Sequence, residues 1–169
     1  TKLLWMNGEH LKRRGADEIA AGCRAAMQRQ GLWRDDVDPA YFRAVVACMG
    51  ERIRLYSDLG EQAAFFFNEE FPYDEKSVKK RLLKEGALGI LREELAALEA
   101  VEPFTAAATD AALHALGERT GRQMGDLVHP VRVAVSGTGV GPGLFDMLAT
   151  MGKERVLRRI RRTLQVYGG

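Results

Sequence analysis

The sequence predicts an all-α protein made of two small helical subdomains, without a substantial sheet. Helix start and stop signals recur: Asp38–Pro39 combines an N-cap residue with a first-turn proline, and Gly31 and Gly50 each follow an apolar helical pattern. Apolar residues recur at helical spacing, most regularly over residues 88–101, and no hairpin turn is evident. With 169 residues, 46% of them hydrophobic and 28% charged, the chain suits one domain or two small ones that share an interface.

The first part of the chain is predicted to hold five helices. Asp17 and Asp74 are the expected N-caps of the first and fourth, and Asp38 that of the second. The third ends in three adjacent aromatic residues, which can pack in a core or stack on bases. The expected ranges are Glu18–Gln30, Ala40–Met49, Leu59–Phe67, Glu75–Lys84 and Leu88–Val101.

Pro103 marks the predicted boundary between the subdomains, residues 1–102 and 103–169. The next helix is expected to start at Thr105 or Thr109, either of which can cap it. The last two helices are expected over Gly143–Met151 and Lys153–Val166.

The segment Val131–Val135 is ambiguous. Valines alternate with other residues, which favours a strand. No partner strand is evident, and an isolated strand is not stable. We therefore expect a helix here, as in the surrounding sequence.

A dense glycine cluster follows this segment: Gly137, Gly139, Gly141 and Gly143, with Pro142 between the last two. Glycine allows a close approach of backbone or ligand, and proline suits the first turn of a helix. An irregular loop that starts a helix at Pro142–Gly143 is expected. A phosphate-binding loop is not, because the pattern GxxxxGK[ST] and its preceding strand are missing.

The charge distribution points to an anion-binding end. Net charge is only +2, but residues 151–169 carry six basic residues against the single acid Glu154. The six are Lys153, Arg155, Arg158, Arg159, Arg161 and Arg162. A glycine loop followed by a basic helix can form a surface for an anionic ligand; the alternative is a solvated basic helix.

The sequence offers little sign of catalysis, metal binding or a membrane span. The three histidines are far apart, and Cys23 and Cys48 lack metal-ligand spacing, so reduced core thiols are expected. No apolar run approaches the roughly 20 residues of a membrane span, and no secretory signal is evident.

Two end motifs carry a resemblance. They are KLLWMNGEHLKRR near the start and VRVAVSGTGVGPGLFDMLATMGKERVLRRI near the end, with FFFNEEF between them. Together they resemble bacterial glutamyl-tRNA synthetases, in the part that follows the KMSKS-type loop, over Lys2–Leu164. The resemblance implies a fragment: the helical anticodon-binding region, with Trp5 at the junction to a catalytic domain.

The resemblance also implies partners and location. The fragment would be cytoplasmic and monomeric, and would contact the anticodon arm of tRNA(Glu) and the catalytic domain of the same parent chain. The parent, a glutamate–tRNA ligase, would use ATP and magnesium. No cofactor and no catalysis are expected here, because the HIGH-type and KMSKS-type motifs are missing.

Site residues follow from the same resemblance. Arg52 occupies the place of the arginine that reads the third anticodon base in members that discriminate tRNA(Glu), and Arg132 that of an arginine close to the anticodon. The loop Gly137–Leu144 corresponds to the segment around the first two anticodon bases, with Leu144 facing them; the family often has a polar residue at Gly141. The RNA contacts predicted in this loop are Gly137, Thr138, Gly139, Gly141 and Leu144.

Each predicted RNA contact also has a structural alternative. Arg159 and Arg162 are predicted to meet phosphates, although at most about half of the arginines in the last helix can face RNA. Arg52 can also be a solvated side chain, Arg132 can pair with an acid such as Asp126, and Leu144 can belong to the core.

Two other functions remain open from sequence. One is a free-standing helical protein-interaction module whose basic tail meets an acidic partner. The other is a small ATP-using enzyme built on the glycine loop, against which the missing lysine counts. Whether the parent also accepts tRNA(Gln) is not encoded in any readable motif.

Overall fold

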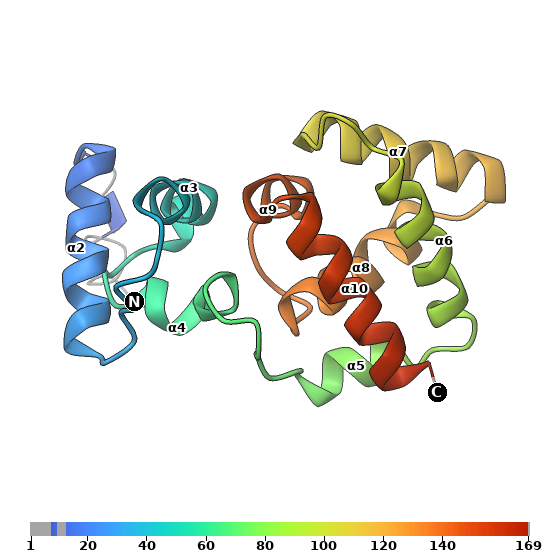
Figure 1. Cartoon of the computed structure of the whole chain (residues 1–169), viewed down its shortest axis with the longest axis horizontal. Helices are drawn as coiled ribbons and strands as arrows, with labels where there is room; N and C mark the ends of the chain where they lie inside the picture. Colours follow the sequence, from blue (N-terminus) through green and yellow to red (C-terminus); the bar gives the residue numbers. More distant parts are fainter. Residues whose placement is uncertain (1–7, 10–12, 169) are drawn as a thin grey trace. The chain divides into compact units, whose positions relative to one another are not determined.

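The computed structural model describes residues 8–9 and 13–168 (Figure 1), so Trp5 and His10 lie outside the described residues. The chain forms two compact units, Thr1–Glu70 and Phe71–Gly169. The described residues form helices and turns without a strand, which confirms the all-α prediction. Val131–Val135 is helical, so the choice of helix over strand is confirmed.

The first unit contains α2 (Ala16–Arg29), α3 (Pro39–Met49) and α4 (Asp58–Gln62), with short 3-10 turns at Gly50–Arg52 and Ala64–Phe66. The Asp38 carboxylate accepts a hydrogen bond from the backbone N–H of Tyr41, which confirms the predicted cap. Asp17 does not cap α2: it lies in the first turn, where its negative charge still favours the helix dipole. The single helix expected over Leu59–Phe67 is two shorter pieces.

Apolar side chains from these helices close the first unit. Cys23 and Met27 of α2 are buried, as are Phe42 and Val45 of α3, and α2 packs against both α3 and α4. Two of the three adjacent aromatics, Phe65 and Phe66, are also buried. Phe65 and Phe66 therefore belong to the core, while Phe67 is half-buried.

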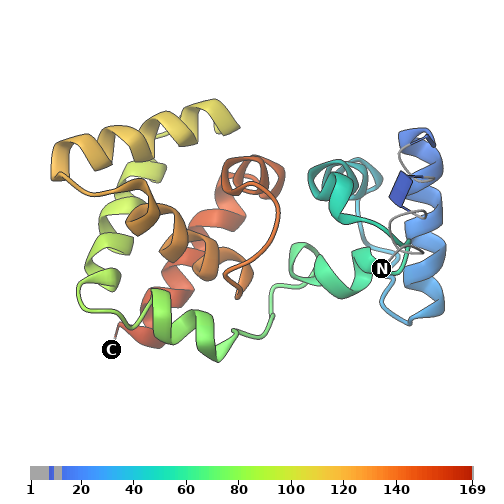
Figure 2. The same ribbon diagram turned by 180° about the vertical axis from the view of Figure 1, so that it is seen from behind.

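The second unit contains six helices. They are α5 (Glu75–Arg81), α6 (Ala87–Glu99), α7 (Ala106–Thr120), α8 (Met124–Ser136), α9 (Leu144–Met151) and α10 (Lys153–Tyr167). The long helix α10 packs against α6, α8 and α9, while α7 packs against α6, α8 and α9. In both ribbon views (Figures 1 and 2), α5 and α7 lie at opposite edges of this unit.

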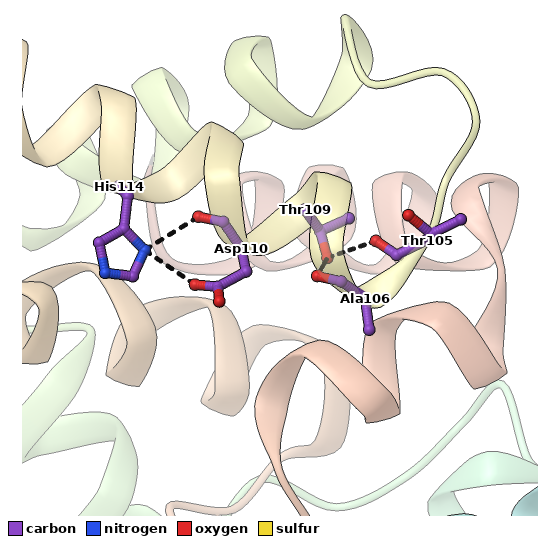
Figure 3. Close-up of polar contacts among 5 residues, drawn as sticks. All are labelled: Thr105, Ala106, Thr109, Asp110 and His114. Carbon is purple, nitrogen blue, oxygen red and sulfur yellow. Dashed lines mark hydrogen bonds and ion pairs between the residues drawn. The ribbon is translucent and has the colours of Figure 1, made fainter.

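Two caps in the second unit follow the sequence closely. The Asp74 carboxylate accepts a hydrogen bond from the Ser77 N–H and so caps α5. Thr105, not Thr109, caps α7 by accepting from the Ala108 N–H. Figure 3 shows that the Thr109 hydroxyl instead lies against the carbonyl oxygens of Thr105 and Ala106, at 2.9 and 3.1 Å.

The boundary predicted at 102/103 is not where the structure divides the chain. The division lies between Glu70 and Phe71. The reason is α6, which precedes Pro103 but packs against α7, α8 and α10 and buries Leu91 and Leu98 there. Pro103 therefore marks a turn within one core, which sequence punctuation alone does not distinguish from a boundary.

No described helix is both long and apolar enough to span a membrane.

Candidate nucleic-acid interface

The glycine loop begins where α8 ends. Gly137 has a φ of 76°, and its N–H donates to the Val133 carbonyl, which closes the last turn of the helix. A Cβ at Gly137 would lie 2.2 Å from the Pro72 carbonyl oxygen. Both the left-handed backbone and the close approach of Pro72 therefore require glycine.

Side chains of α10 complete the end of α8. The last carbonyl groups of a helix have no partner within it. The Thr163 hydroxyl donates to the Ala134 carbonyl at 3.2 Å, and Nη1 of Arg159 donates to the Val135 carbonyl at 2.8 Å. The starting point of the glycine loop is thereby fastened to α10.

The first half of the loop is also bonded to the start of α5. The Asp74 N–H donates to the Gly137 carbonyl at 2.7 Å, and the Gly139 N–H donates to Oγ of Ser77 at 3.0 Å. The Ser77 hydroxyl donates to the Asp74 carboxylate at 2.6 Å. These bonds from the Ser77 hydroxyl and N–H lower the pKa of Asp74 and keep it ionised.

The second half of the loop is bonded to Arg132. Nη1 of this half-buried arginine donates to the Pro142 carbonyl at 2.7 Å. Asp126, the acid considered as its partner, forms an ion pair with Lys84 at 3.4 Å. Arg132 thus lies at the loop, and part of its hydrogen-bonding capacity shapes the loop itself.

The outward surface of the loop is small and mainly backbone. Val140 is 73% exposed, and Thr138, Gly139 and Gly141 are half-exposed. Leu144 is only 4% exposed, so the expectation that it faces the bases is wrong. As the first residue of α9 it packs into the core instead.

The predicted phosphate contact by Arg159 is also wrong. Its side chain is 1% exposed, and its guanidinium lies 4.6 Å from the centre of the Phe71 ring. Arg162 is half-buried, lies 4.6 Å from the same ring and donates to the Tyr73 hydroxyl. Both arginines hold the Phe71–Tyr73 segment against α10.

A signal for this inward placement was present in the sequence. Val156, Ile160 and Thr163 recur at helical spacing and are buried. Arg159 lies three residues from Val156 and four from Thr163, which puts it on the same face of the helix. Its charge alone suggested an exposed position.

The outward arginines of α10 have acidic partners. Arg158 pairs with Glu154 one turn earlier, and Arg161 pairs with Glu99 of α6. The basic tail is therefore partly neutralised within its own unit, which does not favour a tail reserved for an acidic protein partner.

A cationic helix face beside the loop was not assigned from sequence. Lys76, Lys79 and Lys80 of α5 are exposed. The pKa of His129, on the adjacent helix α8, is lowered by burial first and then by the positive charges of Arg81, Arg132 and Lys80. The spacing of the lysines in EKSVKKR was the available signal.

Arg52 is exposed at the end of the 3-10 turn that follows α3. Gly50, with a φ of 49°, ends that helix, and so places Arg52 on the short connection expected from sequence. Arg52 belongs to the first unit, whereas the other predicted contact residues belong to the second.

Both described histidines lie on helices of the second unit. His114 pairs with Asp110 on α7 at 2.8 Å (Figure 3), and His129 is on α8. Within the described ranges, no three His, Cys, Asp or Glu residues are grouped so as to hold a metal ion. What the second unit presents is a fixed loop with a backbone surface beside a row of cations.

Comparisons with known proteins give a consistent result. The family model described as "Anticodon binding domain" matches residues 18–164. A glutamate–tRNA ligase of Thermus thermophilus is 36% identical over 165 residues, which cover 96% of this chain and 34% of that protein. Glutamate–tRNA ligase 2 of Thermoanaerobacter pseudethanolicus is 33% identical over 163 residues, again 96% and 34%. The chain spans about a third of the length of these curated relatives.

A solved structure shares the fold. The glutamate tRNA ligase of Elizabethkingia meningosepticum, crystallised with its amino acid, superposes with a TM-score of 0.84 at 23% identity. The superposition covers 97% of this chain and 32% of that one.

Proposed function

The chain belongs to the anticodon-binding domain family, and we propose that it binds the anticodon arm of tRNA(Glu), as one chain per RNA. The observation that carries this proposal is the loop Gly137–Leu144, whose backbone is hydrogen-bonded to α8 and to the first residues of α5. Sequence-specific proteins commonly read the splayed bases of single-stranded RNA loops. Because this loop is already ordered, little conformational entropy is lost when a base docks on it.

The loop would read bases mainly through shape and backbone groups. Val140 offers an exposed apolar side chain, and the half-exposed glycines on either side allow a base to approach the main chain. A side chain at Gly141 would meet Nη1 of Arg132 at 3.3 Å. Glycine at position 141 therefore keeps space beside an arginine that can donate to RNA.

Arg52 would read the third anticodon base. Its exposed guanidinium can form two parallel hydrogen bonds with a base edge or stack on the base face. This role extends the resemblance to glutamyl-tRNA synthetases and agrees with the position of Arg52 on an exposed connection.

The contribution of the chain to glutamylation would be differential binding. A wrong anticodon loses contacts or leaves polar groups unpaired, so the correct tRNA is held longer. Bond chemistry is not assigned to any residue of this chain. The relatives are ligases about three times as long, and the ATP, magnesium and glutamate of such a reaction would be bound elsewhere in a ligase.

Footprinting tests the place of contact. The chain is incubated with tRNA(Glu), and backbone cleavage by hydroxyl radicals is mapped along the RNA. Protection should concentrate in the anticodon loop and its adjoining stem. Protection confined to the acceptor stem, or an unchanged pattern at saturating protein, would refute the proposal.

A further inference from the structure

One face of α5 carries three lysines, with the exposed acid Glu75 one turn before Lys79. Lys76, Lys79 and Lys80 are exposed, while Val78 is buried on the opposite side of the helix. Residues separated by three or four positions lie on one face of a helix. Lys76 and Lys80 are one turn apart, about 6 Å along the axis, so each can reach a different phosphate.

In the described part of the chain these lysines form no close ion pair, although the hydrogen bonds from Ser77 that lower the pKa of Asp74 are supplemented by the charge of Lys76. The structure places no carboxylate within 4.0 Å of the ammonium groups of Lys76, Lys79 or Lys80. Lys84, beyond the end of α5, pairs with Asp126, and Arg158 and Arg161 of α10 pair with acids. The positive charge of α5 is therefore less compensated than that of α10, although α10 contains more arginine.

The basic face is continuous with the glycine loop. Ser77, which is next to Lys76, accepts the hydrogen bond from the Gly139 N–H, and Asp74 donates its N–H to Gly137. Farther along, burial lowers the pKa of His129 of α8; the charges of Arg81, Arg132 and Lys80 lower it further, and Asp126 opposes them. Positive charge therefore extends from the loop along the contact between α5 and α8.

Resting on the proposed function, we propose that the RNA backbone next to the bases held at Gly137–Leu144 follows this face of α5, with its phosphates paired to Lys76, Lys79 and Lys80. The RNA backbone on either side of the bound bases must pass close to the protein loop Gly137–Leu144. Because α5 is hydrogen-bonded to the first half of this loop, it lies next to that path. Lysine–phosphate contacts fix register and orientation and carry no sequence information. Affinity for RNA therefore depends on α5, and discrimination on the loop and Arg52.

The test uses two kinds of variant. Lys80→Gln and the triple variant Lys76→Gln, Lys79→Gln, Lys80→Gln remove charge from α5 and keep side-chain length. Arg119→Gln removes one charge from α7, where Arg119 is exposed. Helix α7 lies at the edge of the unit opposite α5 (Figures 1 and 2). Circular dichroism melts check that each variant keeps its fold.

Each protein is titrated at several salt concentrations with an RNA stem-loop of the tRNA(Glu) anticodon arm, with and without a changed anticodon. The salt slope is the slope of the logarithm of the binding constant against the logarithm of the salt concentration. Its magnitude should fall by about 0.7 for Lys80→Gln and about 2 for the triple variant, because a single-strand phosphate contact that is lost no longer releases its counterions. The affinity ratio between the two RNAs should stay unchanged, and Arg119→Gln should keep the full slope.

The outcomes distinguish failure of the α5 path from failure of the proposed anticodon recognition. If the unchanged protein discriminates anticodons but the α5 variants keep its salt slope, the α5 path is wrong and the function stands. If the α5 variants lower the slope but no protein discriminates anticodons, the path stands and the function fails. If the unchanged protein binds neither RNA, or Arg119→Gln lowers the slope as much as Lys80→Gln, the α5 path is overturned.

Discussion

Nη1 of Arg159 lies 2.8 Å from the carbonyl oxygen of Val135, inside the second unit. Arg159, which is 1% exposed, thus pairs with a carbonyl group in the last turn of α8, just before the loop begins at Gly137. Charged groups are rarely buried unless they are hydrogen-bonded or otherwise partnered. The relationship makes α10 a support for the end of α8 from which the loop begins.

Replacing Arg159 by Met should therefore destabilise the second unit. Methionine keeps much of the volume but leaves the Val135 carbonyl unpaired, which costs about 1–3 kcal/mol. Urea unfolding measures the loss. The control Arg158→Met, on the exposed face, should stay within about 0.5 kcal/mol of the original protein. If the Arg159 variant were as stable as the original protein but had a lower RNA salt slope, Arg159 would be a phosphate contact after all.

Replacing Gly137 by Ala should be costlier than the same change at Gly121. Both glycines have a left-handed backbone, with φ of 76° and 67°. An added Cβ meets open space at Gly121 but lies 2.2 Å from the Pro72 carbonyl oxygen at Gly137. The Gly121 variant should lose about 1–2 kcal/mol from backbone strain alone. Equal unfolding free energies for the two variants would mean that Pro72 does not constrain the loop.

Much of the fold was predictable because helix caps are local. Asp38 and Asp74 bond to N–H groups three residues ahead, so sequence spacing is enough to place them. The domain boundary was placed at Pro103 because the sequence does not show that α6 packs on α10. That packing depends on residues far apart in the chain.

The site was predictable in part for the same reason. Glycines mark the loop, but whether Arg159 or Leu144 faces outward depends on tertiary partners such as Phe71. The exposed face of α5 carried a readable spacing of lysines. Its importance emerges only from the bond between Ser77 and Gly139, which are 62 positions apart.

Replacing Glu94 by Gln should stabilise the second unit at neutral and alkaline pH. Glu94 is 0% exposed, and both carboxylate oxygens lack a hydrogen-bond partner. Burial raises the pKa of Glu94 from 4.5 to about 9, against the opposing charge of Arg122. The folded protein keeps the proton that the unfolded chain releases, so stability should fall as pH rises from 4.5 to about 9.

The slope attributable to Glu94 should approach 1.4 kcal/mol per pH unit within that interval. Urea unfolding of the original protein, Glu94→Gln and Glu118→Gln across the interval measures it; Glu118 is exposed on α7 and serves as control. Only Glu94→Gln should flatten the curve. Parallel curves for all three proteins would show that Glu94 is ionised in the folded state.

Replacing Arg52 by Gln should lower discrimination at the third anticodon base by about 1–3 kcal/mol, the scale of a bidentate base contact. Glutamine keeps some hydrogen bonding but loses the charge and the forked geometry. Arg54→Gln is the matched control, since Arg54 is also exposed two residues later. Binding curves with tRNA(Glu) and a third-base variant measure the ratio. If Arg52→Gln weakened both tRNAs equally, Arg52 would be a phosphate contact.

The most direct test of anticodon recognition is the ratio of two dissociation constants. The unchanged chain is titrated with tRNA(Glu) and with the same tRNA carrying a different base at one anticodon position, at one salt concentration. Each substitution should weaken binding by about 1–3 kcal/mol, roughly 5- to 150-fold, because a mismatched base loses its paired contacts. Equal dissociation constants for tRNA(Glu) and for all anticodon-substituted forms would contradict the account.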